Sequence, residues 1–393
     1  MTVSRDPAVI LTFSSHYLPG YKGGGPIRSI ANMVEQLGDE FQFRVVASDR
    51  DLGDSAPYSG VPVDVWVTVG KAQVFYRSPG RAGWSALLRS VDRLSFDLIY
   101  LNSFFSASSS LRPLTYRHLG RLASRPVLLA PRGEFSPGAL SLKPAKKRVF
   151  LACANMIGLH QGVTFQASSD HEAADVRRVL GGVPIHVASD LPAQPIPAAR
   201  NIDPQPTGGP LRAAFLSRIS PMKNLLGALQ ILKSVSVPVT FEIYGVIEDR
   251  EYWARCQAII AALPSHIQAR YQRPLHPDEV VAVLSGHDFF FMPTLGENYG
   301  HAIREALSAG LPVLISDQTP WRGLADKSAG ADLPLDAPDA FVAWIEEFAQ
   351  LAPKQRFDMS RAARNRGDDP AEIAAALEAN RAMLLSAIAN DVA

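Results

Sequence analysis

The chain is poor in cysteine, has almost no net charge and lacks long apolar runs. Its two cysteines, Cys153 and Cys256, each lie in an apolar stretch, which excludes a disulfide framework and a zinc site of closely spaced cysteines. The formal net charge of +1 argues against a protein that mainly binds nucleic acid, because such proteins usually have a strong basic excess. No stretch approaches the roughly 20 apolar residues that cross a bilayer, and the amino terminus has no signal-peptide pattern. We therefore expect a cytoplasmic protein that does not bind nucleic acid.

In both halves of the sequence, short apolar runs alternate with segments of helical period, which is typical of βαβ units and parallel sheets. In the first half this pattern predicts strands over 8–14, 43–48, 97–101, 127–130, 163–166 and 185–187, and helices over 27–37, 108–122 and 145–157. In the second half it predicts strands over 211–216, 239–244, 289–292 and 313–316, and helices over 223–235, 250–263, 299–309, 338–351 and 370–388. The expected fold class is α/β.

The composition changes between the two halves. The stretch from about 191 to 210 contains six prolines and the pair Gly208-Gly209, which is typical of an interdomain linker. Since 393 residues exceed what one core usually supports, we expect two Rossmann-like lobes with a ligand-binding cleft between them. The expected parts are an N-terminal acceptor-binding lobe over 1–195, a proline-rich linker over 196–210, a C-terminal donor-binding lobe over 211–369, and a helix within 370–393 that packs back on the N-terminal lobe.

The most informative motif is PTLGENYGHAIREALSAGLPVLISD, residues 293–317. It places a glycine-containing loop between a predicted strand and a predicted helix. Three free backbone amides are expected at the start of this helix, those of Asn298, Tyr299 and Gly300. Such amides, together with the helix dipole, favour an anion. Glu297 lies beside them and Glu305 about two turns further on, roughly 12 Å away, which suits a ligand with hydroxyl groups on both sides of a phosphate bridge.

A second motif, SRISPMKNL, follows the predicted strand over 211–216 and carries Arg218 and Lys223. Two cations on a loop that opens a helix can bind a diphosphate, the arginine as a fork and the lysine as a point charge. The one Asp-x-Asp sequence, Asp49-Arg50-Asp51, has a cation between its carboxylates and is interpreted as a solvated loop rather than a metal site.

With these motifs the sequence resembles the retaining glycosyltransferases of the GT-B fold, glycosyltransferase family 4 or group 1, whose E-x7-E signature falls on Glu297 and Glu305. The resemblance covers nearly the whole chain and is strongest from Arg218 to Trp321. It implies a GT-B architecture with two lobes facing a central cleft. It also implies a UDP- or GDP-sugar donor and a saccharide or lipid-linked acceptor, as in bacterial polysaccharide or glycoconjugate synthesis. No cofactor and no metal ion are expected.

The resemblance also implies roles for individual residues. Arg218 and Lys223 neutralise the leaving nucleoside diphosphate, Glu297 contacts the transferred sugar, and Glu305 binds the ribose hydroxyls. Gly245 stands where the family has a glycine close to the nucleobase. The family's usual glycine in a neighbouring segment is replaced here by Arg273, so the choice between uridine and guanosine stays open.

In the first half, Gly23-Gly24-Gly25 precede Pro26, which suits the first turn of a helix. Glycines let a ligand approach the backbone closely, and the amides of a helix start favour phosphate. The family has a glycine-rich loop here that contacts the donor diphosphate, so Gly24 and Gly25 are predicted to bind donor. Read without the resemblance, a flexible turn is equally consistent with the pattern.

Three residues of the first half are predicted to bind the acceptor. Arg132 and Glu134 follow a predicted strand and are expected to face the cleft, where Glu134 orients an acceptor hydroxyl. An exposed Arg-Glu loop is the alternative. Asn102 stands where many relatives carry a histidine. Asp170 is expected to cap the helix that follows it.

The segment with Lys143, Lys146, Lys147 and Arg148 abuts an apolar helix. Two interpretations stay open: peripheral contact with an anionic membrane surface, or a core-facing helix with a charged edge. For the whole protein the alternatives to a glycosyltransferase are a sugar-nucleotide epimerase on the same fold and a non-catalytic sugar-nucleotide-binding scaffold.

Overall fold

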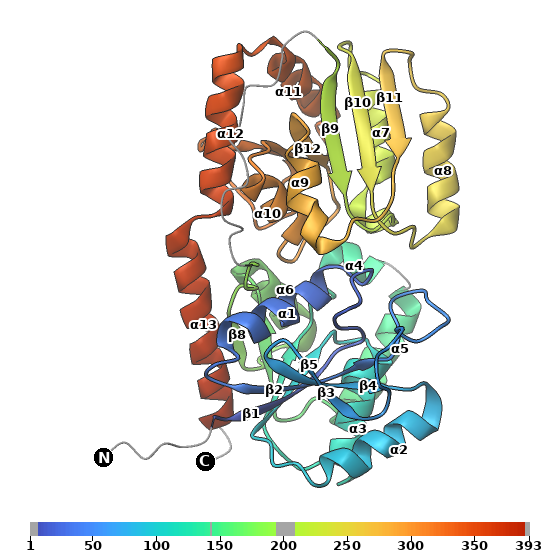
Figure 1. The fold of residues 1–393 in the computed structure, drawn as a ribbon, viewed down its shortest axis with the longest axis vertical. Helices are drawn as coiled ribbons and strands as arrows, with labels where there is room; N and C mark the ends of the chain where they lie inside the picture. Colours follow the sequence, from blue (N-terminus) through green and yellow to red (C-terminus); the bar gives the residue numbers. More distant parts are fainter. Residues whose placement is uncertain (1–6, 142–143, 194–208, 390–393) are drawn as a thin grey trace. The chain divides into compact units, whose positions relative to one another are not determined.

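The structure is a computed structural model that describes residues 7–141, 144–193 and 209–389. The chain divides into two compact units, each built on one sheet (Figure 1). Unit 1 comprises Met1–Ala193 and Ala374–Ala393, and unit 2 comprises Gln194–Ile373. Most of the predicted linker, 196–208, lies outside the described residues.

Unit 1 contains an eight-stranded sheet in the order β3-β4-β2-β1-β5-β6-β7-β8. Its strand pairs are parallel, except that β3 and β4 are antiparallel at one edge. The strands are β1 (Val9–Phe13), β2 (Gln42–Ser48), β3 (Trp66–Val69), β4 (Ala72–Arg77), β5 (Leu98–Asn102), β6 (Val127–Ala130), β7 (Val163–Ala167) and β8 (Ile185–Val187). The helices are α1 (Gly25–Leu37), α2 (Gly80–Val91), the π-helical turn η1 (Ala107–Leu111), α3 (Arg112–His118), α4 (Pro137–Ser141), α5 (Pro144–Met156), α6 (Asp170–Leu180) and α13 (Pro370–Ala389).

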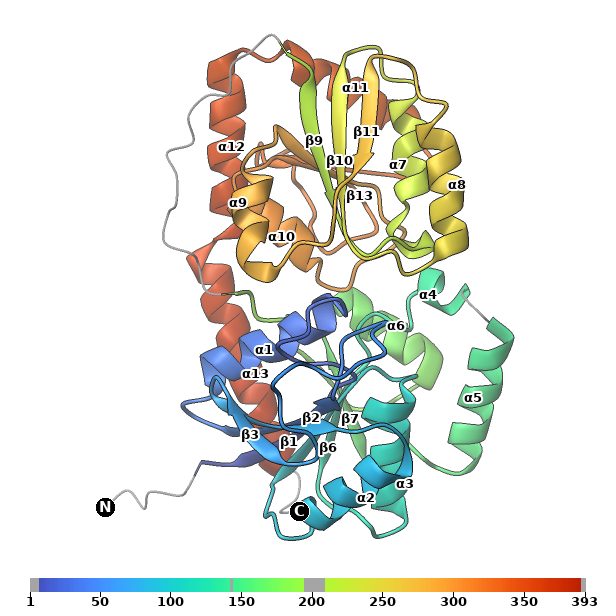
Figure 2. The same cartoon turned by 45° about the vertical axis from the view of Figure 1, so that its right-hand side comes forward.

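The last helix, α13, belongs to unit 1 from Ala374 onward (Figure 2). Asn380 Nδ2 donates to Ser189 O at 2.7 Å, and Arg381 Nε donates to Glu40 Oε2 at 2.7 Å. Met383 is among the α13 residues buried in the same hydrophobic cluster as α1. The helix therefore completes one side of the unit 1 core.

Unit 2 contains a six-stranded parallel sheet in the order β11-β10-β9-β12-β13-β14. The strands are β9 (Leu211–Leu216), β10 (Val239–Tyr244), β11 (Ile267–Tyr271), β12 (Phe289–Met292), β13 (Val313–Ser316) and β14 (Gly330–Leu333). The helices are the 3-10 turn η2 (Pro221–Lys223), α7 (Leu225–Leu232), α8 (Arg250–Ile260), the 3-10 turn η3 (Pro277–Glu279), α9 (Val280–Leu284), α10 (His301–Ser308), α11 (Pro338–Gln350) and α12 (Pro353–Gly367).

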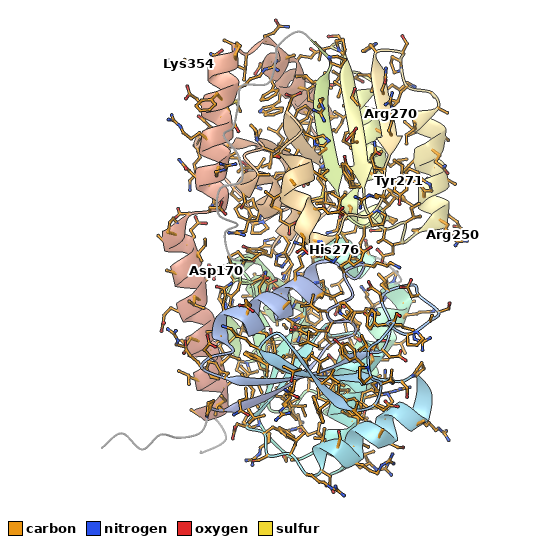
Figure 3. The ribbon with its side chains drawn as sticks, viewed as in Figure 1. Asp170, Arg250, Arg270, Tyr271, His276 and Lys354 are labelled. Carbon is orange, nitrogen blue, oxygen red and sulfur yellow. The ribbon has the colours of Figure 1, made fainter. Side chains whose placement is uncertain are left out.

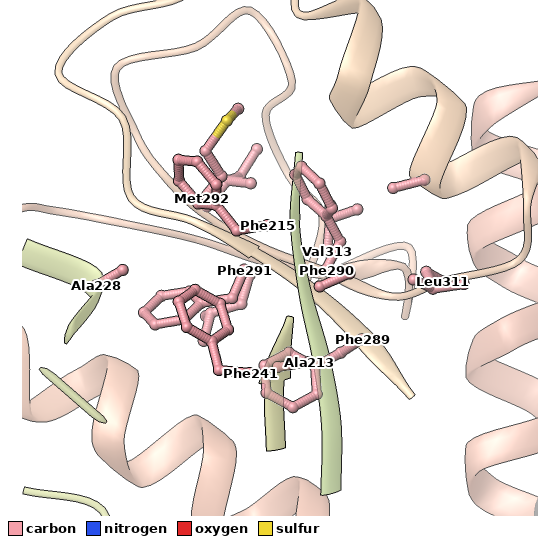
Figure 4. Packing of buried hydrophobic residues seen from close by; sticks show 14 of the residues in the cluster. Ala213, Phe215, Ala228, Phe241, Phe289, Phe290, Phe291, Met292, Leu311 and Val313 are labelled. Atoms are coloured by element: carbon pink, nitrogen blue, oxygen red, sulfur yellow. The ribbon is translucent and has the colours of Figure 1, made fainter. Parts of the chain in front are cut away.

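The central strands of unit 2 are continuous apolar runs because helices cover both faces of a parallel sheet. Every residue of β12, with the sequence Phe-Phe-Phe-Met, is buried. The ring of Phe241 lies 6.3 Å from that of Phe215 and 5.9 Å from that of Phe291 (Figure 4). Phe289, two residues before Phe291 in β12, lies on the same face of the sheet, and its ring lies 5.5 Å from that of Trp344 in α11. This core holds the strand ends in place.

In each sheet the chain builds strands first on one side of the first strand and then on the other side. In unit 1 the first strand, β1, has β2 on one side and β5 on the other. In unit 2 the first strand, β9, has β10 on one side and β12 on the other. Ligands of open α/β sheets bind at the carboxyl ends of the strands at such a switch point. The predicted glycine loop follows β1, and the two charged motifs follow β9 and β12, so all three lie at switch points.

The fold class and every predicted strand are confirmed, with ends shifted by no more than one residue. The expected helix over 108–122 is instead a π-helical turn followed by the shorter α3. α6 is capped by Ser169, whose side chain accepts from Glu172 N at 3.2 Å. The expectation that Asp170 is the cap is therefore wrong, and Asp170 is the first residue of the helix (Figure 3).

His160 in unit 1 provides a test of how burial affects stability. Its ring stacks on Phe104, with ring centroids 4.4 Å apart, and burial lowers its pKa from 6.5 to about 4. The unfolded chain therefore binds this proton at a higher pH than the folded chain. The stabilisation is fully present above pH 6.5 and is lost as the pH falls towards 4.

We expect His160→Phe, which keeps a stacked ring but cannot titrate, to lose less stability on acidification than the wild type. The difference between pH 7.5 and pH 4.5 should be at most about 3 kcal/mol, measured by denaturant unfolding of both proteins at each pH. Parallel pH profiles for the two proteins would contradict the burial argument.

Candidate active site

The loops after β9 and β12, at the switch point of unit 2, are joined by hydrogen bonds. Met222 O accepts from Leu295 N at 2.9 Å and from Thr294 Oγ1 at 3.0 Å. Asn224 Nδ2 donates to Pro293 O at 2.8 Å. One main-chain bond and two bonds from uncharged side chains to main-chain oxygens therefore hold the two loops in one arrangement, independently of the charged side chains that they carry.

Lys223 and Glu297, one from each loop, form an ion pair. Lys223 Nζ lies 2.6 Å from Glu297 Oε1, and the two side chains are 14% and 11% exposed. Asn224 has a left-handed φ of 54° and caps α7 by accepting from Gly227 N at 3.2 Å, so the helix begins after Lys223 rather than at it. Glu297 N in turn donates to Gln318 O, beyond β13, at 3.0 Å. The structure thus brings together two predicted residues that are far apart in sequence.

Arg218 has a partner that the sequence analysis did not identify. Its Nη1 lies 2.8 Å from Glu248 Oε1, with side chains 35% and 38% exposed. Glu248 follows β10, the strand beside β9, so the Arg218 and Lys223 cations are paired with carboxylates from the loops on either side. Both cations are held near the ends of the same strand by exchangeable ionic contacts.

Gly245 is required by close packing of two backbones. Its φ is 144°, and a Cβ atom at this position would lie 1.7 Å from Ser217 O. The loop after β10 can approach the residue before Arg218 only because this side chain is missing. Nearby, Tyr271 Oη donates to Gly245 O at 3.0 Å. This steric role is independent of the predicted contact between Gly245 and a nucleobase, which stays a prediction.

On the same side of unit 2, Arg273 forms a bidentate ion pair with Glu279, at 2.7 Å and 2.8 Å. The side-chain hydrogen bond from Arg273 lowers the pKa of Glu279 to about 2. Arg273, which lies on the loop before η3, is thus held in place by the carboxylate of Glu279.

α10 begins at His301, two residues later than predicted. Gly300 is its N-cap, with a left-handed φ of 81°, and Arg304 N donates to Gly300 O at 3.1 Å. Trp321 Nε1 donates to Tyr299 O at 2.7 Å. Asn298 and Tyr299 therefore belong to an ordered loop before the helix, and their amides are not those of its first turn.

The two glutamates do not lie on one helix. Glu305 is half-buried in the second turn of α10, whereas Glu297 lies in the irregular loop before it. No continuous helix joins the two residues, so the rise of an α-helix does not give the distance between them.

In unit 1 the glycine loop leads into α1 as predicted, with Gly24 as N-cap at φ 69° and Pro26 in the first turn. Asp51 fixes the approach to this loop, because its Oδ2 accepts from Tyr21 N at 2.8 Å and from Lys22 N at 3.1 Å. Contact of Gly24 and Gly25 with the donor stays a prediction. The sequence analysis missed the role of Asp51, although its place after β2, beside β1, was a usable signal.

The interpretation of Asp49-Arg50-Asp51 as a solvated loop is wrong. Both aspartates are only 4% exposed. Asp49 Oδ1 accepts from Arg50 Nε at 2.8 Å, and Asp51 accepts from backbone amides. Within residues 7–141, 144–193 and 209–389, no group of three or more His, Cys, Asp or Glu side chains could hold a metal ion.

Arg132 and Asn102 lie in a buried network of unit 1 rather than on an open surface. The guanidinium of Arg132, whose side chain is 6% exposed, forms an ion pair with Asp190. It also donates to Asn102 Oδ1 at 2.7 Å and to Tyr100 Oη at 2.8 Å. Asp190 accepts a further hydrogen bond from Ser29 Oγ of α1 at 2.7 Å. The alternative of an exposed loop is therefore wrong for Arg132.

Glu134 is likewise turned inward. Its carboxylate accepts from Ser103 Oγ at 2.5 Å, Phe104 N at 2.5 Å and Phe105 N at 3.0 Å, and burial raises its pKa. These bonds join the loop after β6 to the loop after β5. Arg132, Glu134 and Asn102 thus shape the strand ends of unit 1 by contacts with the chain itself, and acceptor binding by them stays a prediction.

Comparison with known proteins identifies chains of similar fold. Residues 201–366 match the protein family described as glycosyl transferases group 1, and no curated protein matches the sequence. Sucrose-phosphate synthase from Thermosynechococcus elongatus is similar in structure, with a TM-score of 0.70 and 13% identity over 97% of this chain and 100% of that chain. HepE from Anabaena, in complex with UDP and glucose, has a TM-score of 0.63 and 15% identity over 96% and 99%. WaaG, a glycosyltransferase involved in lipopolysaccharide biosynthesis, has a TM-score of 0.58 and 14% identity over 94% and 98%. The chain therefore has the fold of these GT-B proteins.

The buried network predicts a stability effect for Arg132. Arg132→Met removes the cationic partner of the buried Asp190 carboxylate, which should cost about 3–5 kcal/mol. Adding Asp190→Asn should recover part of this loss, because the residues are in direct contact. Hydrogen exchange of backbone amides in β5 and β6, read by mass spectrometry, measures the local stability. If Arg132→Met left exchange unchanged while activity fell, Arg132 would be a ligand-binding residue and the structural role would be wrong.

Proposed function

Because residues 201–366 match the family of glycosyl transferases of group 1, we propose that the chain moves a sugar from a nucleotide-sugar donor, a UDP- or GDP-sugar, onto a saccharide or lipid-linked acceptor. The observation that carries this proposal is the Lys223–Glu297 pair at the switch point of the unit 2 sheet. A cation and a carboxylate meet there on two loops fixed by hydrogen bonds to main-chain oxygens, at the place where α/β sheets bind ligands.

Lys223 and Arg218 are the groups that stabilise the leaving nucleoside diphosphate in this proposal. Transfer of a glycosyl group builds negative charge on the departing diphosphate, and preorganised cations lower the barrier for that step. Each cation has one carboxylate partner, Glu297 or Glu248, at hydrogen-bond distance. A diphosphate that binds here would compete for the ammonium and guanidinium protons and take over part of that pairing.

Glu297 orients the transferred sugar, and Glu305 holds the ribose hydroxyls of the donor. Glu297 is restrained at both ends, by its backbone bond to Gln318 and by its side-chain bond to Lys223. Such restraint supports a positioning task, since a misplaced reacting group costs rate. The loop of Asn298, Tyr299 and Gly300 and the backbone at Gly245 complete the donor side.

The proposed reaction keeps the configuration of the anomeric carbon and uses no metal ion. The basis for retention is the family resemblance. Metal independence is supported by the two cations, because they can supply the charge that a metal ion supplies in other transferases. An epimerase or a non-catalytic scaffold, the two alternatives, would use the same donor site. The reaction products distinguish these alternatives from a glycosyltransferase.

Removal of either member of the Lys223–Glu297 pair should impair transfer. We expect Lys223→Ala and Glu297→Ala each to lower turnover more than about a hundredfold, the scale seen when one charge-stabilising donor is deleted. The double variant should lose less than the product of the two single effects, because the side chains touch. Lys354→Ala, an exposed lysine of α12 in the same unit (Figure 3), is the matched control and should be fully active. Thermal unfolding of each variant shows whether the fold persists, and wild-type-like transfer by Lys223→Ala or Glu297→Ala would refute the assignment.

The reaction itself is tested with the wild-type chain, UDP- and GDP-sugars and EDTA, with products followed by NMR at the anomeric carbon. We expect one donor to be consumed in EDTA, by transfer or by slow hydrolysis, with retained configuration. The same nucleotide should raise the melting temperature, because a ligand that binds only the folded state stabilises it. Conversion of the donor sugar into its epimer, binding without turnover, or an inverted product would each overturn the proposal in a distinguishable way.

A further inference from the structure

α5 carries an apolar stripe on the side that faces away from unit 1. The residues of this stripe follow one another at helical spacing and all are exposed: Ala145, Val149, Ala152, Cys153 and Met156. Val149 is 64% exposed and Met156 80%. In both ribbon views α5 stands at the outer side of unit 1 (Figures 1 and 2). A contiguous exposed stripe of this kind, unlike single exposed apolar residues, indicates an interaction surface.

The opposite side of α5 supplies its attachment to unit 1. Phe150 packs on an aromatic cluster, with its ring 5.8 Å from that of Phe104 and 5.4 Å from that of Phe105, and Ala154 is buried. Lys147 also points inward, with Nζ 2.7 Å from Ala139 O. Because the inner side anchors the helix, the outer stripe is not needed for folding.

The charged side chains of α5 and of the segment around it in sequence are all positive. No aspartate or glutamate occurs from Phe135 to Ser169. Lys146 and Arg148 are exposed, and at about 100° per residue they project on the two flanks of the stripe. An apolar strip bordered by cations is the pattern of a helix that lies in the interface of a membrane with anionic lipids.

We propose that this outer side of α5 binds the surface of a bilayer that contains anionic phospholipid. Val149 and Met156 enter the boundary between headgroups and acyl chains, while Lys146 and Arg148 contact the headgroup phosphates. Among the described residues no helix is long and apolar enough to cross a membrane, so the contact is peripheral. A second copy of the same surface is a poorer partner, because a symmetric contact would bring four cations together.

The full chain is tested by co-sedimentation with phosphatidylcholine vesicles with and without phosphatidylserine. We expect binding only to the anionic vesicles, and weaker binding at high salt because screening reduces surface attraction. Lys146→Gln/Arg148→Gln should weaken binding about thirtyfold, since each cation near such a surface contributes about fivefold. Val149→Ser/Met156→Ser should weaken it more than about tenfold through lost apolar burial.

Matched controls are Arg81→Gln/Arg89→Gln, two exposed arginines of α2 in the same unit, and Leu385→Ser, an exposed leucine of α13; these should bind like the wild type. Equal binding to both vesicle types, or equal losses in the controls and the α5 variants, would overturn the proposal. A concentration-dependent dimer that Met156→Ser abolishes would instead assign the stripe to self-association. The assay contains no sugar nucleotide, so its failure would leave the proposed reaction untouched.

Discussion

The ion pair between Lys223 and Glu297 is the interaction on which the candidate site depends. It joins the ends of β9 and β12, two adjacent strands whose loops run in different directions from the switch point of the sheet. An ion pair at this degree of burial adds little net stability, because the cost of desolvating both charges offsets most of their attraction. Hydrogen bonds accepted by Met222 O and Pro293 O already hold the loops together. The pair therefore contributes little to the stability of the fold. Its main contribution is to hold a cation and a carboxylate at fixed positions in the candidate site.

The two units use their charges differently. In unit 1, Arg132, Asp190, Glu134 and Asp51 are turned inward and satisfied by partners from several loops of that unit. In unit 2, the Arg218–Glu248 pair is about one-third exposed on both sides. Buried and fully paired charges rigidify a structure, whereas half-exposed ion pairs can exchange partners at low cost. The strand ends of unit 1 thus form a rigid frame, whereas Arg218 of unit 2 remains available to an incoming anion.

The parts of the fold that the sequence predicted are those where one physical signal dominates. Central parallel strands such as β12 must be apolar on both faces, so their limits were found to within one residue. The strands that were missed, such as β3 and β11, carry exposed residues and lie at sheet edges, so their composition resembles that of loops. The start of α10 was misplaced because the left-handed N-cap at Gly300 depends on packing against Trp321, which follows in sequence only after the next strand.

For the site, residue identity was predictable but environment was not. Lys223 and Glu297 could be chosen from local motifs, since the amino acids before and after each of them mark the end of a strand and the start of a helix. Whether Arg132 is exposed depends on Asp190, which lies 58 positions further along the chain and reaches it only through the folded sheet. Local sequence contains no trace of that partner, and an arginine after a strand has the same appearance whether it binds a ligand or a buried aspartate. The roles of residues that position other residues therefore could not be predicted from the sequence, because these roles depend on contacts between segments that are distant along the chain.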